Sequence, residues 1–304
     1  MEKIIIGVDT GNRCIKTAHF SFISGIKKSD ENMPFTQDML KYNDTCYLLT
    51  QNRITYMQDK STSDEYFVLT LYALVRELEY RGIDMSGTIP ISLGVGLPPS
   101  HIPLYKKSFR NYFKRGLVTF ELNKKVYYID IQNVTVFAQG YAGIYLDYET
   151  ISKFGRAYII DIGGYTTDVI SINHGRIDPE FCESFDMGLI HTFNKISREV
   201  HKHYGRTPTE AQIDEMISTG IEISPDMPCL KIADAILAEY VEDLTRKLLE
   251  FGIDLKFSRG IFMGGGSERL KHWIESSNMV TNPYFILNVH ANAQGYEAIL
   301  NSLN

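Results

Sequence analysis

The chain has 304 residues, a length that corresponds to about two domains. It is 44% hydrophobic and 22% charged, which is typical of a globular protein with an ordinary core. The net charge of −6 excludes a globally basic surface for nucleic acid. The first apolar run breaks at Asp9, and no stretch approaches the ~18 apolar residues that a membrane helix needs. We therefore expect a cytoplasmic protein with no membrane partner and no direct nucleic acid partner.

The first half of the chain mixes strands and helices. Residues 3–10 and 14–22 predict a hairpin closed around the dipeptide "GN". Apolar spacing over 62–82 predicts a helix whose start fits a capping box of Thr62 and Glu65 and whose end is Gly82. The other predicted elements are hairpins at 46–57 and 117–131, a strand at 89–98, a helix at 105–116, and a strand at 134–138 that runs into a helix near 139–148.

The second half repeats this mixture. A capping box of Thr207 and Glu210, with Pro208 at the first helical position, predicts a helix over 207–218. The other predicted elements are strands at 157–164, 166–172 and 284–288, a strand at 259–266 that ends in a turn, helices at 186–205, 231–252 and 267–275, and a helix over the last twelve residues. Buried-type strands beside hairpins indicate the α/β class, with a mixed sheet in each half.

Two segments about 150 residues apart share one pattern. Residues 4–20 and 157–172 each contain an apolar run, an aspartate, a turn with glycine, and a return strand that begins with polar residues. Asp9 matches Asp161, and Gly11 matches Gly163. A motif repeated near the start of each half predicts duplicated domains that face each other.

The residue types in these turns suit a phosphate ligand. Glycine lets the backbone approach a ligand closely and direct N–H groups at it. Two carboxylates that point into one cleft repel each other, and a hydrated Mg²⁺ between Asp9 and Asp161 would remove that repulsion. The side chains that can donate to phosphate oxygens are Asn12, Lys16, Thr166 and Thr167.

A third glycine cluster, Gly264-Gly265-Gly266, follows an apolar strand and precedes a helix. It is neither a dinucleotide fingerprint nor a P-loop, and by itself it indicates a plain loop. Combined with the two aspartate–glycine turns, it is interpreted as the third wall of a nucleotide cleft.

The order of these motifs resembles that of the actin-like ATPases, a superfamily that includes actin, the large heat-shock ATPase chaperones and sugar kinases. The chain looks most like the bacterial plasmid-segregation actins of the ParM/StbA type. It departs from the usual pattern at Ala138, where a proline is common, and at Asn12 and Arg13, where many relatives have glycine. The segments that carry the resemblance are GVDTGNRCIKTAHF (7–20), VTVFAQGYAGIY (134–145), DIGGYTTD (161–168), FMGGGSERL (262–270) and NVHANAQGYEAIL (288–300).

The resemblance implies duplicated RNase H-like domains with a nucleotide cleft between them. Domain I would be 1–138, with a C-terminal helix at 290–304 that packs back on it, and domain II would be 139–289. The cofactors would be ATP, with GTP possible, and Mg²⁺.

The resemblance also implies a role for each motif. Asp9 and Asp161 would hold the hydrated metal, and Gln139, at the start of the crossing helix, would orient the attacking water. Asp168 is left outside this set, because it can cap the N–H groups of its turn. The nucleotide-binding set would be Gly11, Asn12 and Lys16 in the first loop, Gly163, Gly164, Thr166 and Thr167 in the second, Gly188 near the ribose and phosphate, and Gly264, Gly265 and Gly266 against adenosine.

The resemblance favours an ATPase that polymerises into dynamic filaments. Its cargo would be a plasmid or other mobile DNA, reached through a DNA-binding adaptor protein, and its other partner would be itself in head-to-tail contact. Two alternatives stay open: a non-polymerising ATP switch that binds a protein partner, and a small-molecule kinase of the same fold.

Overall fold

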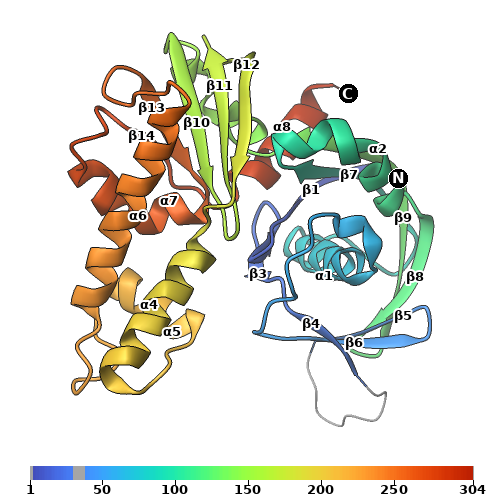
Figure 1. The fold of residues 1–304 in the computed structure, drawn as a ribbon. Coiled ribbons are helices and arrows are strands. Elements are labelled where there is room, and N and C mark those ends of the chain that lie inside the picture. Colours follow the sequence, from blue (N-terminus) through green and yellow to red (C-terminus); the bar gives the residue numbers. More distant parts are fainter. Residues whose placement is uncertain (1–2, 30–37, 304) are drawn as a thin grey trace. The chain divides into compact units, whose positions relative to one another are not determined.

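The computed structural model describes residues 3–29 and 38–303. Residue 304, the last of the predicted C-terminal helix, lies outside the described residues. The chain divides into two compact units, 1–148 together with 289–304, and 149–288 (Figure 1). Each unit is a mixed sheet with flanking helices, so the predicted α/β class is confirmed.

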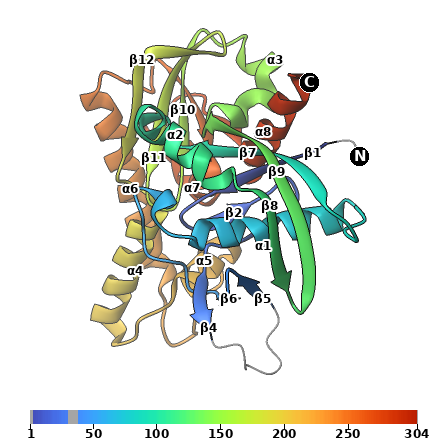
Figure 2. The ribbon, with the colours of Figure 1, turned by 90° about the vertical axis from the view of Figure 1, so that its right-hand side faces the viewer.

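The first unit is built on a sheet whose order, among the described residues, is β3-β2-β1-β7-β9-β8-β5-β6-β4. β1, β7 and β9 run parallel, whereas β2 is antiparallel to β1 and β3 is antiparallel to β2. Figure 2 shows β8 and β9 as a long hairpin along one side of this unit. The strands are β1 (Ile4–Thr10), β2 (Cys14–Lys16), β3 (Ser21–Ile23), β4 (Ile26–Ser29), β5 (Met39–Tyr42), β6 (Thr45–Leu49), β7 (Ile89–Leu97), β8 (Gly116–Leu122) and β9 (Lys125–Ala138).

Helix α1 (Glu65–Tyr80) fills the core of the first unit. Every residue from Tyr66 to Val75 is buried, so the helix is enclosed on all sides rather than on the one predicted face. Gly82, with φ +64°, ends it as predicted. The predicted Thr62 cap is wrong, because Thr62 belongs to a short 3₁₀ turn and the N-cap is Asp64. The other helical segments of this unit are η1 (Lys60–Thr62), η2 (Pro99–His101), α2 (Ile102–Phe113), η3 (Ala142–Asp147) and α8 (Ala291–Ser302), and α3 (Tyr148–Ile151) leads into the second unit.

The second unit has a sheet of order β12-β11-β10-β13-β14. β10 pairs antiparallel with β11 and parallel with β13, as β1 pairs with β2 and β7 in the first unit. The shared order and directions confirm the internal duplication that the two motifs predict. The strands are β10 (Arg156–Ile162), β11 (Thr167–Asn173), β12 (Arg176–Phe185), β13 (Arg259–Met263) and β14 (Tyr284–Ile286).

Four helices pack on this second sheet or on one another (Figure 1). The predicted capping box of α5 is wrong by two residues. The N-cap is Thr209 and Gln212 closes the box, in place of the predicted Thr207 and Glu210. Within the described ranges, no helix is long and apolar enough to cross a membrane. The helices are α4 (Leu189–Tyr204), α5 (Glu210–Thr219), α6 (Leu230–Glu250) and α7 (Gly264–Ser276).

Five predicted elements differ from the structure. The hairpin at 46–57 is wrong, because the real one joins β5 to β6 through Asn43 and Asp44, both in the left-handed region. Residues 134–138 continue β9 rather than forming a separate strand, and the crossing helix is mainly the 3₁₀ segment η3. The strand at 14–22 is split into β2 and β3, and the triple glycine lies inside the first turn of α7.

Candidate functional site

The first glycine hairpin places a carboxylate opposite an ammonium group. Asp9, near the end of β1, is the register partner of Lys16 on β2. Lys16 Nζ lies 3.5 Å from Asp9 Oδ2, and Asp9 is only 3% exposed. Antiparallel pairing therefore brings two of the predicted site residues together in a nearly dry position.

Gln139, which directly follows β9, joins this pair. Its Nε2 donates to Asp9 Oδ1 over 2.7 Å, and its backbone N–H donates to Leu97 O at the end of β7 over 2.9 Å. Because β1, β7 and β9 are parallel, their carboxyl ends meet at one edge of the sheet, which is why these residues converge. Gln139 lies in the turn after β9, not at a helix start as predicted, because η3 begins only at Ala142.

The first loop is held by hydrogen bonds from three other segments, two to its backbone and one to a side chain. Ser24 Oγ donates to Gly11 O over 2.6 Å, and Tyr66 of α1 donates to Asn12 Oδ1 over 2.9 Å. Lys60 of η1 donates to the carbonyl oxygen of Thr10. Asn12 therefore has its side-chain oxygen held by α1.

The C-terminal helix α8 contacts both segments that flank Asp9. Asn292 Oδ1 accepts the N–H of Gly140 over 2.9 Å, next to Gln139. Gln294 Nε2 donates to Ala18 O over 2.9 Å, two residues after Lys16. Within the first unit, α8 therefore orients the segments that carry Lys16 and Gln139.

A buried cluster of charges ties β1 to α1 and α8 beneath the first hairpin. Glu77 accepts from the Thr17 hydroxyl over 2.6 Å and from Arg81 Nε over 2.8 Å. Glu297 accepts from Arg81 Nη2 over 2.6 Å and from the N–H of Gly7 over 2.9 Å. Burial alone would raise the pKa of Glu77, but hydrogen bonds, including those from Thr17 and Arg81, hold its pKa below the usual value. Burial outweighs similar bonds at Glu297 and raises its pKa.

The second hairpin is closed by its own backbone and held by α4. The N–H of Gly163 donates to Thr166 O over 2.9 Å. The first N–H groups of α4, those of Leu189 and Ile190, donate to the carbonyls of Gly163 and Gly164 over 3.2 and 2.9 Å. A side chain at Gly188 would overlap the backbone of Gly164 and Tyr165, so glycine is required for this close approach.

Asp161 lies opposite a second carboxylate. Its register partner on β11 is Asp168, which in turn faces Ser184 on β12. Ser184 Oγ donates to Asp168 Oδ1 over 2.5 Å. This bond gives Asp168 a role that the sequence did not assign, which is to join β11 to β12 through their side chains.

The triple glycine lies against Asp161. A side chain at Gly264 would overlap Asp161 Oδ1, and one at Gly266 would overlap Ile162, whereas Gly265 faces open space. Gly264 also has φ +83°, which favours glycine. Since α7 begins at Gly264, the N-terminal N–H groups of the helix lie in this glycine segment.

Thr167 differs from its predicted role. Its hydroxyl is buried and donates to Met187 O, and it lies 3.0 Å from Tyr240 OH. Burial raises the pKa of Tyr240, which stays neutral and also donates to Met187 O over 2.9 Å. Thr167 therefore fixes the turn before Gly188 instead of pointing its hydroxyl at a phosphate, because the pairing of β11 with β12 turns it inward.

The residues around Asp9 fit an oxygen-bound cation and a phosphate. The hydroxyl of Thr10 is fully buried and has no hydrogen-bond partner among the described residues, and such a group usually meets water or a ligand. Among those residues, no group of three or more His, Cys, Asp or Glu side chains could hold a metal by itself. A magnesium ion at Asp9 or Asp161 would then take its other ligands from water and phosphate.

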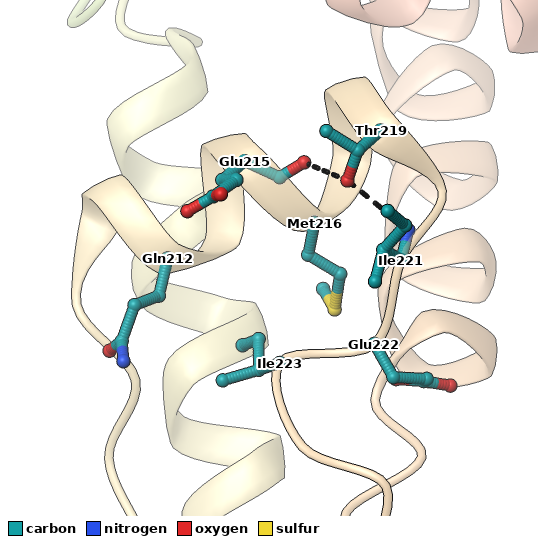
Figure 3. Close-up of a pocket in the computed structure, with 7 residues that line it drawn as sticks. All are labelled: Gln212, Glu215, Met216, Thr219, Ile221, Glu222 and Ile223. Atoms are coloured by element: carbon teal, nitrogen blue, oxygen red, sulfur yellow. Dashed lines mark hydrogen bonds between the residues drawn. The ribbon is translucent and has the colours of Figure 1, made fainter.

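A separate pocket lies between α5 and the segment that follows it (Figure 3). Glu222 accepts the N–H groups of Cys229 and Leu230 over 2.6 and 3.0 Å, at the start of α6. Thr219 bridges Glu215 O and the N–H of Ile221. These bonds satisfy helix ends, so we assign no functional site here. The lining residues are Gln212, Glu215, Met216, Thr219, Ile221, Glu222 and Ile223.

Comparisons with known proteins agree for the two halves. Residues 7–141 match the family model "Actin like proteins N terminal domain", and residues 159–276 match "Archaeal actin homologue MreB-like, C-terminal". A sequence search of curated proteins finds no match.

Solved structures match the chain over nearly its whole length. Ta0583, an archaeal actin homolog solved in complex with ADP, has TM-score 0.78 and 19% identity, covering 98% of this chain and 99% of its own. The ParM of a 15-stranded filament from Clostridium botulinum has TM-score 0.77 and 20% identity, covering 99% and 100%. The Alp12 filament structure has TM-score 0.67 and 15% identity, covering 100% of both. The matching family models of both halves and the shared fold together place the chain in the actin-like superfamily.

Proposed function

We propose that this chain binds a nucleoside triphosphate with Mg²⁺, hydrolyses it, and assembles head to tail into dynamic filaments. The observation that carries the proposal is the contact of Gln139 with Asp9 beside Lys16, at the carboxyl edge of the first sheet. An amide, a carboxylate and an ammonium group that meet at one place are groups that recur in sites for phosphoryl transfer to water. Ta0583, which shares the fold, was solved with ADP.

Each residue of the first hairpin has a proposed task. Lys16 neutralises charge on the phosphates, and the amide of Gln139, fixed by Asp9, orients a water molecule. Asp9 and Asp161 would hold Mg²⁺ largely through water, and the ion would neutralise charge that develops on the phosphate oxygens.

The second hairpin and the triple glycine complete the proposed nucleotide site. The backbone N–H groups near Gly164 and Thr166 approach the phosphates, and the glycine segment at the start of α7 takes the adenosine. The open space at Gly265 supports this assignment. ATP is the proposed nucleotide, with GTP as the alternative.

Filament assembly is supported by the fold. A ParM and Alp12, both structural neighbours, were solved as filaments. A head-to-tail contact does not close on itself and therefore produces an open filament. The net charge of −6 argues against direct DNA contact, so we propose that plasmid or other mobile DNA is reached through an adaptor protein.

A combined assembly and hydrolysis assay tests the proposal. Protein is mixed with Mg·ATP while light scattering and phosphate release are followed, and the product is pelleted and imaged. We expect filaments that form with ATP and decay as phosphate is released. A solution that stays clear at high protein concentration, although ATP is bound, would refute the filament proposal.

The variant Gln139→Ala separates binding from hydrolysis. We expect nucleotide affinity to persist, hydrolysis to fall about 100-fold, and filaments to last longer. Gln132→Ala is the matched control, because Gln132 is an exposed residue of β9, the strand that leads to Gln139, and its amide donates to Asp130 over 3.0 Å. Loss of binding in Gln139→Ala would show that this residue holds the ligand instead.

A further inference from the structure

Lys60 is a buried lysine beneath the first glycine loop. It is 6% exposed, and its Nζ donates to the carbonyl oxygen of Thr10. The ammonium also lies 5.0 Å from the ring centroid of Tyr66. Lysine is almost never this buried unless its charge is compensated, because a desolvated ammonium is costly.

The surroundings of Lys60 converge on the turn that follows β1. Tyr66, which stacks under the ammonium, donates to Asn12, and Lys60 itself holds Thr10. The side-chain hydroxyl of Thr10 is buried without a partner among the described residues. Residues of η1 and α1 therefore hold the carbonyl of Thr10 and the side chain of Asn12. The hydroxyl of Thr10 is left as a buried polar group that a ligand could bond.

The positive charge of Lys60 also acts on His101, shortly after the end of β7. Burial lowers the pKa of His101 in η2, and the positive charge of Lys60 lowers it further. His101 follows β7 by four residues, at the sheet edge where Gln139 bonds to Leu97. The ammonium thus contributes positive potential at the edge that carries Asp9 and Gln139.

We propose that Lys60 is a positioning residue for the nucleotide phosphates, one that fixes the carbonyl of Thr10 and adds a buried positive charge to that of the half-buried Lys16. A preorganised charge in a water-poor site acts on phosphate more strongly than an exposed one. The proposal rests on the nucleotide function above and adds a residue that none of the sequence motifs contains.

Arg81, at the end of α1, provides a matched control because it also donates to a carbonyl of β1. Its Nη1 donates to Ile5 O over 2.9 Å, as Lys60 donates to Thr10 O five residues further along β1. Arg81 lies in the carboxylate cluster with Glu77 and Glu297, near the start of β1 rather than at the loop. Removing either cation deletes a bond to a β1 carbonyl, but only Lys60 is next to the proposed phosphates.

The experiment measures nucleotide affinity and apo stability on the same variants. Lys60→Met, Lys60→Arg and Arg81→Met are titrated with a fluorescent ATP analogue and with ADP, and their thermal midpoints are recorded without nucleotide. We expect Lys60→Met to weaken binding at least about tenfold, the equivalent of one charge-assisted hydrogen bond, and ATP more than ADP. Lys60→Arg should bind within about threefold of the parent, while Arg81→Met should lose thermal stability but keep its affinity.

Each outcome decides between the proposals. A folded Lys60→Met with the parent's affinity overturns the role of Lys60 alone, as does an equal loss of affinity in Arg81→Met. A parent protein that binds neither nucleotide overturns the proposed function and this inference with it. If Lys60→Met does not fold, Lys60→Gln replaces it, since glutamine keeps a donor for Thr10 without the charge. Unchanged affinity in Lys60→Gln would then contradict the requirement for charge.

Discussion

The two glycine hairpins have the same place in their sheets but opposite charge arrangements. Asp9 faces Lys16 across the first hairpin, whereas Asp161 faces Asp168 across the second. Both aspartates lie at the carboxyl end of a central strand with a parallel neighbour on one side. Since like charges directly opposite each other destabilise an antiparallel pair, the second hairpin requires compensation that the first does not.

That compensation comes from segments outside the second hairpin. Ser184 of β12 donates to Asp168, and the absent side chain of Gly264 leaves room for the carboxylate of Asp161. The first hairpin contains its own cation, and Lys60 adds another below it. The two hairpins therefore share a topology but differ in charge, because the first pairs its aspartate with a lysine and the second pairs its aspartate with another carboxylate.

The largest expected effect is on ATP hydrolysis, and it distinguishes Asp9 and Asp161 from Asp168. Asp9→Asn and Asp161→Asn should each lower ATP hydrolysis by about 100-fold or more, because each removes a carboxylate proposed to act at the metal. Asp168→Asn should stay within about fivefold of the parent, since Asp168 bonds to Ser184. Phosphate release at saturating Mg·ATP is the measurement. Equal losses in Asp168→Asn and Asp161→Asn would mean that both carboxylates of the second hairpin serve the reaction.

The next effect is on the second hairpin's stability. Gly264→Ala should lower the free energy of unfolding by about 3 kcal/mol, because alanine is strained at φ +83° and its Cβ overlaps Asp161. Gly265→Ala is the control, since its side chain would meet nothing within 4 Å, and we expect a change within about 0.5 kcal/mol. Urea unfolding followed by the fluorescence of Trp273, the only tryptophan, reports on this unit. Equal destabilisation by the two variants would show that the space at Asp161 does not matter.

The sequence predicted the hairpins and their aspartates because both signals are local. Alternating apolar residues and a glycine turn are read within about fifteen residues, and the duplicated topology follows from the repeat. The cap of α5 was missed because TPTEAQ contains two overlapping capping boxes, and only packing selects Thr209 over Thr207. β12 was missed because its charged residues and Pro179 are atypical of a central strand, and the structure has it at the sheet edge.

Contacts between distant segments could not be predicted from one sequence. Lys60 precedes a helix in a polar stretch, where a lysine usually faces solvent, and only the tertiary fold buries it under Thr10. The inward bond of Thr167 to Met187 has the same origin, since it depends on the register of β12. The motif identified the residues of the second loop correctly as a turn, but not the direction of the Thr167 hydroxyl.

A smaller effect tests how the first hairpin is supported. The pKa of Glu77 is lowered in the folded protein, so its charge stabilises the fold above the ordinary glutamate pKa of about 4.3 and this contribution is lost as the pH falls below it. Glu77→Gln should cost about 2 kcal/mol at pH 7, and the difference from the parent should shrink toward pH 3. Glu297, whose pKa is raised, acts in the opposite sense and is present in both proteins.

Urea unfolding followed by far-ultraviolet circular dichroism at pH 7, 5 and 3 provides this measurement. Trp273 fluorescence is the internal control, because it lies in the second unit and should respond equally in parent and variant. A gap between the two proteins that widens as the pH falls would reverse the sign assigned to Glu77.

The smallest effect concerns the bond that accommodates the second buried carboxylate. Ser184→Ala removes the hydroxyl that donates to Asp168, and we expect a loss of about 1–2 kcal/mol in the free energy of unfolding of the second unit. If compensation of like charge is the reason for this bond, the double variant Ser184→Ala/Asp161→Asn should be more stable than the sum of the two single changes predicts. Additive losses would mean that Asp161 and Asp168 do not repel each other in the folded state, and that the contrast between the two hairpins lies in the first one alone.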